Sequence, residues 1–156
     1  AVGHGGQGRR VADGEILPAV MPVGHPAARR SPIDLMFRIG ARSARRRTWE
    51  DLFRFSRSDA GVWEPCLEAV RLGPSASNAQ PWRIAKEPDR PVFHLGITAV
   101  ADGHLVHRLD AGIAMCHFAL VAAELGLPGA WNGAGGDAGH PLLPTGTIHV
   151  ATWIPG

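Results

Sequence analysis

The sequence is poor in the residues that build disulfide frameworks and metal knuckles. Its only cysteines, Cys66 and Cys116, stand far apart, and no CxxC pair is present. Two such cysteines exclude a multi-bridge framework. Their apolar, helix-like surroundings predict small buried side chains, and a cytoplasmic location is expected. None of the eight histidines combines with Cys, Asp or Glu at zinc-binding spacing, and HExxH and HxxxH are absent. We therefore expect no metal.

Long apolar runs and a strong net charge are also missing. No apolar run approaches the roughly 20 residues that a membrane helix needs, so no membrane span is expected. The formal net charge is only +2 and Lys86 is the single lysine, which argues against a nucleic-acid-binding protein. With 156 residues and 45% hydrophobic composition, the chain has the size of one globular domain with a real core.

Two motifs of common enzyme classes are absent as well. Ser75 and Ser77 do not lie in a GxSxG nucleophile elbow. The glycines at 133, 135 and 136 neither follow a predicted strand nor begin a helix, so a Rossmann fingerprint is not supported.

The histidines at 104 and 107 lie three residues apart in a segment expected to be a loop. His117 is expected to be a hydrogen-bonded core histidine.

Helical and strand patterns alternate along the chain without a regular βαβ rhythm. Helices are predicted where capping and periodicity agree, at 49–55 with Thr48 as N-cap, at 64–72 before Gly73-Pro74, and at 109–125, an apolar and therefore buried segment. Strands are predicted at 82–86, 92–97 and 147–153, with 16–24 as an edge or irregular segment. Loops are expected at 56–61 and 133–139. These patterns favour an α+β sandwich with helices packed on a mainly antiparallel or mixed sheet.

The loop from Gly73 to Trp82 is unusually rich in polar groups. It carries two serines, Asn78 and Gln80 on backbone stiffened by two prolines. One interpretation is a polar loop whose side chains cap their own backbone. The other is a site for a flat, heteroatom-rich ligand, because ordinary turns need far fewer polar groups.

Arginines gather shortly before this loop, at positions 42, 45, 46 and 47. Arginine matches phosphate oxygens in bidentate fashion, which suits a phosphate site. The alternatives are a solvated helix face or a charged contact with a partner. No acid, base or nucleophile accompanies the two segments, so the pattern favours a cofactor that brings its own chemistry, with flavin as the leading candidate.

Two longer segments resemble a known family. PSASNAQPW (74–82), followed by RIAK, is similar to the flavin-binding signature of the nitroreductase family, and DAGIAMCHFALVAAELGLPGAW (110–131) is similar to its later helix. The resemblance covers roughly 16–153. More narrowly, it is similar to a subgroup in which two nitroreductase-like halves lie in one polypeptide, and this chain resembles the C-terminal portion. Such proteins bind FMN at a dimer or pseudo-dimer interface and pass hydride from NAD(P)H to nitroaromatic, quinone or similar acceptors.

The resemblance also implies site residues. Those that would bind FMN are Arg45, Arg46, Arg47, Thr48, Pro74, Ser75, Ser77, Asn78 and Gln80. The family's Arg-x-Ser-x-Arg/Lys motif corresponds either to Arg46 and Thr48, with Glu50 at the second cation's place, or to Arg42-Ser43-Ala44-Arg45. No catalytic side chain or metal ligand is implied.

The same comparison predicts an incomplete unit. Residues 1–15 are expected to be a flexible glycine-rich segment and 16–156 the nitroreductase-like domain. We expect the subgroup's N-terminal half to be missing, so that a homodimer or pseudo-dimer would complete the fold and the second wall of the flavin site. Basic residues of the family are also absent near 147–156. The alternative function is therefore a degenerate, non-catalytic module that binds a partner or a nucleotide-like ligand.

Overall fold

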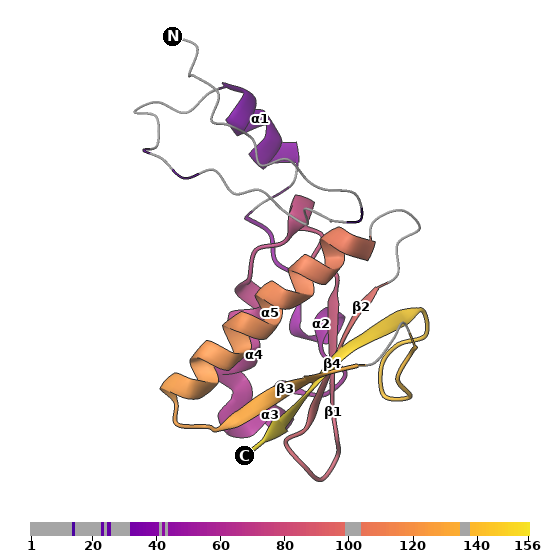
Figure 1. The fold of residues 1–156 in the computed structure, drawn as a ribbon. Coiled ribbons are helices and arrows are strands. Elements are labelled where there is room, and N and C mark those ends of the chain that lie inside the picture. The colour runs from indigo at the N-terminus through magenta and orange to yellow at the C-terminus, as the bar shows by residue number, and fades with distance from the viewer. Residues whose placement is uncertain are drawn as a thin grey trace.

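The fold is an antiparallel sheet with helices against it, seen in a computed structural model that describes residues 14, 23, 25, 32–40, 42, 44–98, 104–134 and 138–156. The sheet order is β1-β2-β4-β3, formed by β1 (Trp82–Lys86), β2 (Phe93–Thr98), β3 (Gly129–Gly133) and β4 (Thr147–Pro155). Adjacent strands are antiparallel throughout this sheet. The expected α+β class is confirmed, and the sheet is antiparallel rather than mixed (Figure 1).

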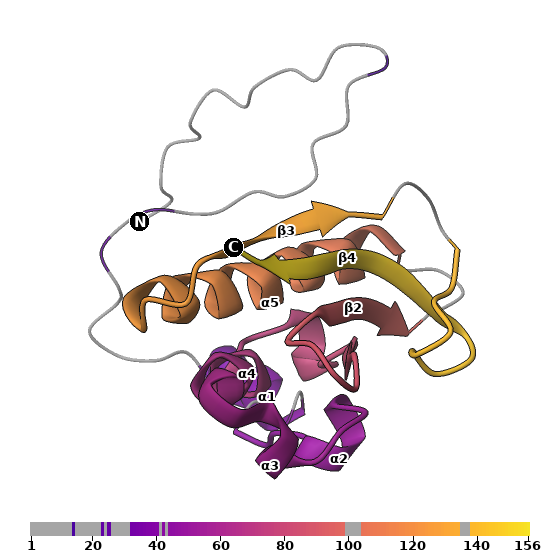
Figure 2. The ribbon, with the colours of Figure 1, turned by 90° about the horizontal axis from the view of Figure 1, so that it is seen from below.

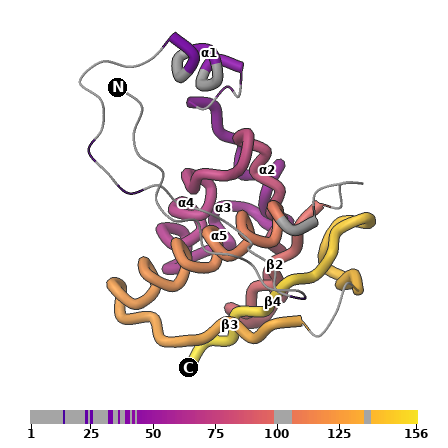
Figure 3. The backbone as a smooth tube through the Cα atoms, turned by 45° about the horizontal axis from the view of Figure 1, so that its top comes forward, coloured from indigo at the N-terminus to yellow at the C-terminus, as the bar shows by residue number. Residues whose placement is uncertain are grey.

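The helices come in one long element and several short ones. They are α1 (Pro32–Gly40), α2 (Trp49–Leu52), α3 (Arg57–Ala60), α4 (Glu64–Leu72) and α5 (His104–Glu124), with 3-10 turns η1 (Gly61–Trp63) and η2 (Ala76–Asn78). Figure 2 shows α5 running along the sheet with α4 on its flank. In Figure 3, α1 lies away from the sheet, at the opposite end of the molecule from the C-terminus.

Local signals place most of these helices. Thr48 caps α2 as predicted, accepting a bond from Asp51 N while the Asp51 carboxylate bonds back to Thr48 N. α2 ends at Leu52 rather than at 55. Ser56 and Asp59 form a second capping box that begins α3. The prediction of a loop at 56–61 is therefore wrong, because α3 occupies most of this range.

The core lies between α5 and the sheet, and it is aromatic. Trp63 stacks on Phe118 of α5 with ring centroids 5.7 Å apart, and Phe93 and Trp153 of the sheet contact both rings. Together these rings bury a large apolar area and hold the helix layer on the strands.

The long helix differs from its sequence-based description in three ways. It begins at His104, so the histidines at 104 and 107 lie in a helix and not in a loop. Only one face packs on the sheet, and Cys116 on the other face is exposed, whereas Cys66 is buried as expected. Among the described residues, 106–124 is also long and apolar enough to cross a membrane, contrary to expectation. Since Ala114, Phe118 and Ala122 pack in the core, the same composition suits a helix of a folded domain.

Two further elements were not expected. α1 and β3 have no counterpart among the predicted elements, and Gly133, expected in a loop, ends β3. The strand expected at 16–24 falls outside the described residues except for Val23. His117 bonds Ala69 O at 3.1 Å, as expected for a hydrogen-bonded histidine, although it is only partly buried.

The sheet face away from α5 carries a cluster of three histidines. The His94 ring stacks on His140 at 3.8 Å, and His149 lies 5.7 Å from His94 and 5.0 Å from His140. Thr152 Oγ1 lies within hydrogen-bond distance of His94 Nδ1 and His149 Nε2, while Glu87 Oε1 lies 3.4 Å from His94 Nε2. Burial, followed by the neighbouring His140, lowers the pKa of His94 and of His149.

Candidate functional site

The polar loop takes its shape from its own side chains and from α5. Gly73 ends α4 with its N–H bonded to Val70 O. Ser75 Oγ then accepts a 2.8 Å bond from Gln80 N, which closes the loop across η2. Asp110 of α5, only 2% exposed, accepts a 2.9 Å bond from Ala76 N. A buried carboxylate therefore fixes the loop to the long helix.

Two carboxamides bind this loop to the arginine segment. The Asn78 side chain donates to Arg42 O at 2.8 Å and to Arg45 O at 2.9 Å. Gln80, 3% exposed, accepts a 2.8 Å bond from Arg47 N and donates to Arg45 O at 3.3 Å. We call these bonds from Asn78 and Gln80 to the 42–47 backbone the carboxamide clasp. They join residues that are 33 to 36 positions apart in the sequence.

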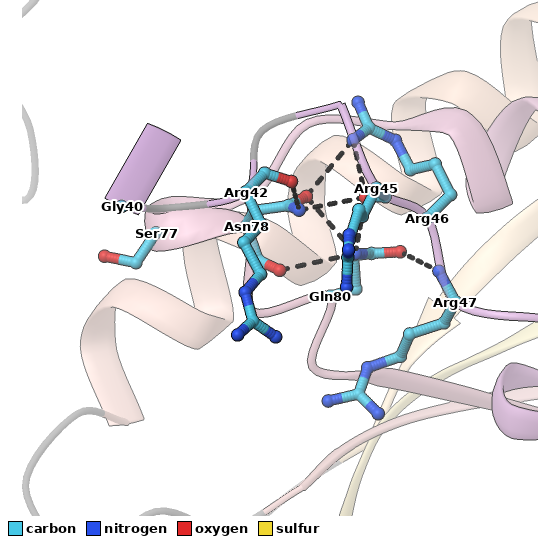
Figure 4. Close-up of a pocket in the computed structure, with 8 residues that line it drawn as sticks. All are labelled: Gly40, Arg42, Arg45, Arg46, Arg47, Ser77, Asn78 and Gln80. Carbon is cyan, nitrogen blue, oxygen red and sulfur yellow. Dashed lines mark hydrogen bonds between the residues drawn. The ribbon is translucent and has the colours of Figure 1, made fainter. Parts of the chain in front are cut away.

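A cavity of about 360 Å³ opens between the two segments. Figure 4 shows its lining side chains, with Ser77 turned away from the clasp and the guanidinium groups spread around it. The lining residues are Gly40, Arg42, Arg45, Arg46, Arg47, Ser77, Asn78 and Gln80. The volume lies in the usual range of small-molecule and cofactor sites.

Backbone strain is concentrated at this cavity. In the described part of the chain, four non-glycine residues have left-handed φ values near +50°: Arg42, Ser77, Asn78 and Gln80. All four line the cavity. This conformation costs about 1–2 kcal/mol for Arg42, Ser77 and Gln80, whereas asparagine adopts it more readily. Strained residues of this kind gather at functional sites, so their coincidence with one cavity points to a binding role.

The electrostatic character of the cavity is positive. Arg42, Arg45 and Arg47 are exposed, and none of them forms an ion pair with the described residues. The Arg46 side chain bonds Leu72 O at 3.1 Å and Asn78 Oδ1 at 3.2 Å, which anchors it to the loop. Behind the cavity, burial lowers the pKa of Arg83, and the nearby Arg47 charge lowers it further. Such a site attracts an anion.

The chain matches the family model described as "Putative TM nitroreductase" over residues 7–122. It belongs to this nitroreductase family. The match spans the arginine segment and the polar loop, which line the cavity, and most of α5, which holds the loop through Asp110. Comparisons with curated proteins and with solved structures found no significant match.

The structure brings together six of the nine residues predicted to bind FMN in this nitroreductase-family chain. Arg45, Arg46, Arg47, Ser77, Asn78 and Gln80 line one cavity. Thr48 caps α2, Ser75 closes its own loop, and Pro74 is exposed at the end of α4, so these three lie outside the lining. Arg42 and Gly40 complete the lining, while Ser43 of the alternative motif falls outside the described residues.

Asp110 holds the polar loop in place, and sequence reasoning did not predict this role. It accepts from Ala76 N and lies 3.2 Å from His107 Nδ1. A signal was present, because Asp110 is the last charged residue before an uncharged stretch that extends to Glu124. A charge that borders an apolar stretch of helix is costly to bury unless it is bonded. Within the described residues, no group of three or more His, Cys, Asp or Glu is suited to a metal ion.

Proposed function

We propose that this nitroreductase-family chain is an FMN-dependent oxidoreductase that passes hydride from NAD(P)H to nitroaromatic, quinone or similar acceptors. The observation that carries the proposal is the arginine-lined cavity, whose lining includes every strained non-glycine residue of the described chain. Its other support is the family match across the elements that build this cavity.

The residues present fit the phosphate end of FMN. Arg42, Arg45 and Arg47 offer guanidinium groups without ion-pair partners among the described residues, and a phosphate is the anion that such forks bind best. The exposed Ser77 hydroxyl offers a further polar group at the rim. The clasp bonds already occupy the carboxamides of Asn78 and Gln80. We therefore propose that these two side chains position the arginines.

When bound, the flavin supplies the hydride chemistry at its N5 atom. The protein's part is to bind and orient it. Asp110 holds the loop at Ala76, the clasp holds the arginine segment against the loop, and no side chain acts as a covalent catalyst. We propose that the reaction takes place in the cytoplasm with a small electron acceptor, without nucleic acid or a membrane.

Two observations favour a second candidate, a non-catalytic module that binds a partner or a nucleotide-like ligand. Glu50 is exposed where the resemblance calls for a second cation, and the clasp leaves few polar groups for a flavin ring. A module of this kind would bind a phosphate without turning over NAD(P)H.

The test is a flavin titration of the purified chain, followed by fluorescence, together with NAD(P)H oxidation in the presence of a quinone. Arg45→Glu should weaken FMN binding by about tenfold or more, because it reverses a charge beside the phosphate. Arg54→Glu is the matched control, since Arg54 is also exposed but does not line the cavity. Equal effects of the two changes would contradict the assignment of the site. Binding without any NAD(P)H oxidation would favour the second candidate.

A further inference from the structure

The loop that leads into β4 lies on the outer face of the sheet, which is the face away from α5. We call this loop, residues 138–146, the strap. Its Leu143 side chain is only 7% exposed, and Leu143 Cδ1 would lie 2.7 Å from a Cβ on Gly96 of β2. A turn inside the strap is closed by a 3.0 Å bond from Leu143 N to His140 O. The strap therefore packs on the sheet and covers part of its outer face.

The histidine cluster, formed by His94, His140 and His149, connects the strap to the sheet. The His140 ring of the strap stacks on His94 of β2, with centroids 3.8 Å apart and an angle of 22° between the ring planes. His149 of β4 lies 5.0 Å from His140, and its backbone N–H donates a 2.9 Å bond to Ala138 O of the strap. Because the rings come from three separate segments, they stay together only while the strap is in place.

The hydrogen bonds of the cluster fit neutral rings. Thr152 Oγ1 lies 2.9 Å from His94 Nδ1 and 3.0 Å from His149 Nε2. His149 Nε2 also lies 3.2 Å from Ala151 O, which can only accept, so this nitrogen carries a hydrogen and Thr152 accepts from it. The Thr152 hydroxyl then donates its one hydrogen to His94 Nδ1. This arrangement leaves His94 Nδ1 without a proton of its own.

Little negative charge is available to stabilise protonated rings. Glu87 Oε1 lies at the long distance of 3.4 Å from His94 Nε2, and the Glu87 carboxylate is already paired with Arg90 at 2.6 Å. Arg83 of β1 stands opposite Gly96 and therefore adds positive charge to the same face. The strap, β3 and β4 carry no Asp, Glu, Lys or Arg. Two protonated rings in this cluster would therefore repel each other with almost no compensation.

We propose that uptake of protons by the histidine cluster separates His140 from His94 and releases the strap from the outer face of the sheet. Release relieves the repulsion between the stacked rings and lets each of them reach water. It also uncovers the apolar contact between Leu143 and β2. The strap is thus a pH-sensitive element of the fold. It does not rest on the proposed function, because it involves neither the arginine-lined cavity nor flavin.

Proton linkage gives the direction of the pH dependence. Burial, followed by the neighbouring His140, lowers the pKa of His94 and of His149, so the form with the strap in place binds fewer protons than the released form. The strap should be held above about pH 6.5, the ordinary histidine value, and released increasingly below it. Each histidine that gains a proton on release raises the ratio of released to held strap by up to about tenfold per pH unit.

The test is hydrogen exchange of the purified full chain, followed by NMR at about pH 7.5 and about pH 5.5. Protection factors remove the intrinsic pH dependence of exchange. The reporters are the amides of Leu143 and His149, which bond carbonyls of the strap. The reference is the amide of Phe118, fully buried in α5, which should exchange only when the domain unfolds. At the lower pH, the protection of both reporters should fall by about tenfold or more and stay below that of Phe118.

A variant separates the stacked pair from other effects of acid. His140→Phe keeps an aromatic ring on His94 but cannot take up a proton, so it should reduce the fall in protection by about threefold or more. His25→Phe makes the same change at an exposed histidine outside the cluster and should show the full fall. Phe118 protection reports whether each variant is folded.

Three results would overturn the proposal. The first is protection of the strap amides that does not change between the two pH values. The second is strap protection equal to that of Phe118 at the lower pH, because the strap would then open only through unfolding of the whole domain. The third is an undiminished fall in folded His140→Phe, because the stacked histidines would then play no part.

Discussion

Replacement of Gln80 by glutamate tests whether the carboxamide clasp organises the site. The Gln80 Nε2 group faces three oxygens, namely Arg45 O at 3.3 Å, Asn78 O at 3.3 Å and Asn78 Oδ1 at 3.2 Å. Gln80→Glu keeps the bond from Arg47 N but turns those three contacts into oxygen against oxygen. The two lost donor hydrogens account for about 2 kcal/mol. Burial of a carboxylate adds at least about 1 kcal/mol, so we expect a loss of about 3 kcal/mol or more.

Urea unfolding and thermal melts measure this loss. In a chain of this size, about 3 kcal/mol corresponds to a fall in Tm of about 6–12 °C. The difference from wild type should shrink at about pH 4.5, because a protonated Glu can again donate one hydrogen bond. Asn132→Asp makes the same chemical change at an exposed position of β3 and should alter stability by less than about 0.5 kcal/mol. A Gln80→Glu chain as stable as wild type at neutral pH would refute the clasp as the organising contact.

Three further predictions concern the supports of the fold and the site. Asp110→Ala should lower the free energy of unfolding in urea by about 1.5–3 kcal/mol, because Ala76 N loses a charged acceptor, and Asp110→Asn should lower it by less. Equal losses for the two variants would show that the acceptor is unimportant. Gly96→Ala should lower the free energy of unfolding by about 2–4 kcal/mol, because a Cβ there would lie 2.7 Å from Leu143 Cδ1 and closer still to Thr147 Cγ2. Gly133→Ala, where a Cβ would meet open space, should leave the stability nearly unchanged. The folded pKa values of His94 and His149 lie below the ordinary histidine value, so the unfolded chain binds more protons and stability should fall as the pH drops below about 7. Unfolding at pH 8 and pH 5.5 measures this slope, and His149→Gln should reduce it; a stability that rises toward pH 5.5 would contradict the account.

The elements that sequence reasoning located are those with local signals. Pro65 and the Gly73-Pro74 pair delimit α4, and the structure places that helix at the predicted residues. β1, β2 and β4 also form within one or two residues of the predicted strands. By contrast, GAWNG at 129–133 has two glycines and an asparagine, which are poor strand formers. It forms β3 because it pairs with β4, where a Cβ on Gly129 would meet the Trp153 ring.

The candidate site was predictable in its residue types and less so in its contacts. The polar loop and the arginine segment could be singled out because their composition is unusual, and the structure brings them together. The self-capping interpretation of the loop holds for Ser75, and the ligand interpretation stays a prediction. Ser75 caps its own loop, whereas Asn78 and Gln80 bond backbone groups more than 30 residues away. No local rule specifies such a long-range partner, because it depends on how the intervening helices pack.

The central claim is that the arginine-lined cavity binds the phosphate of FMN. The most direct test is a paired fluorescence titration of the purified chain with FMN and with riboflavin, which differ by that phosphate alone. The account predicts that the affinity for FMN exceeds that for riboflavin by about tenfold or more at low salt. This difference in affinity should shrink as the salt concentration rises. Equal affinities for the two flavins, or no binding of either, would contradict it.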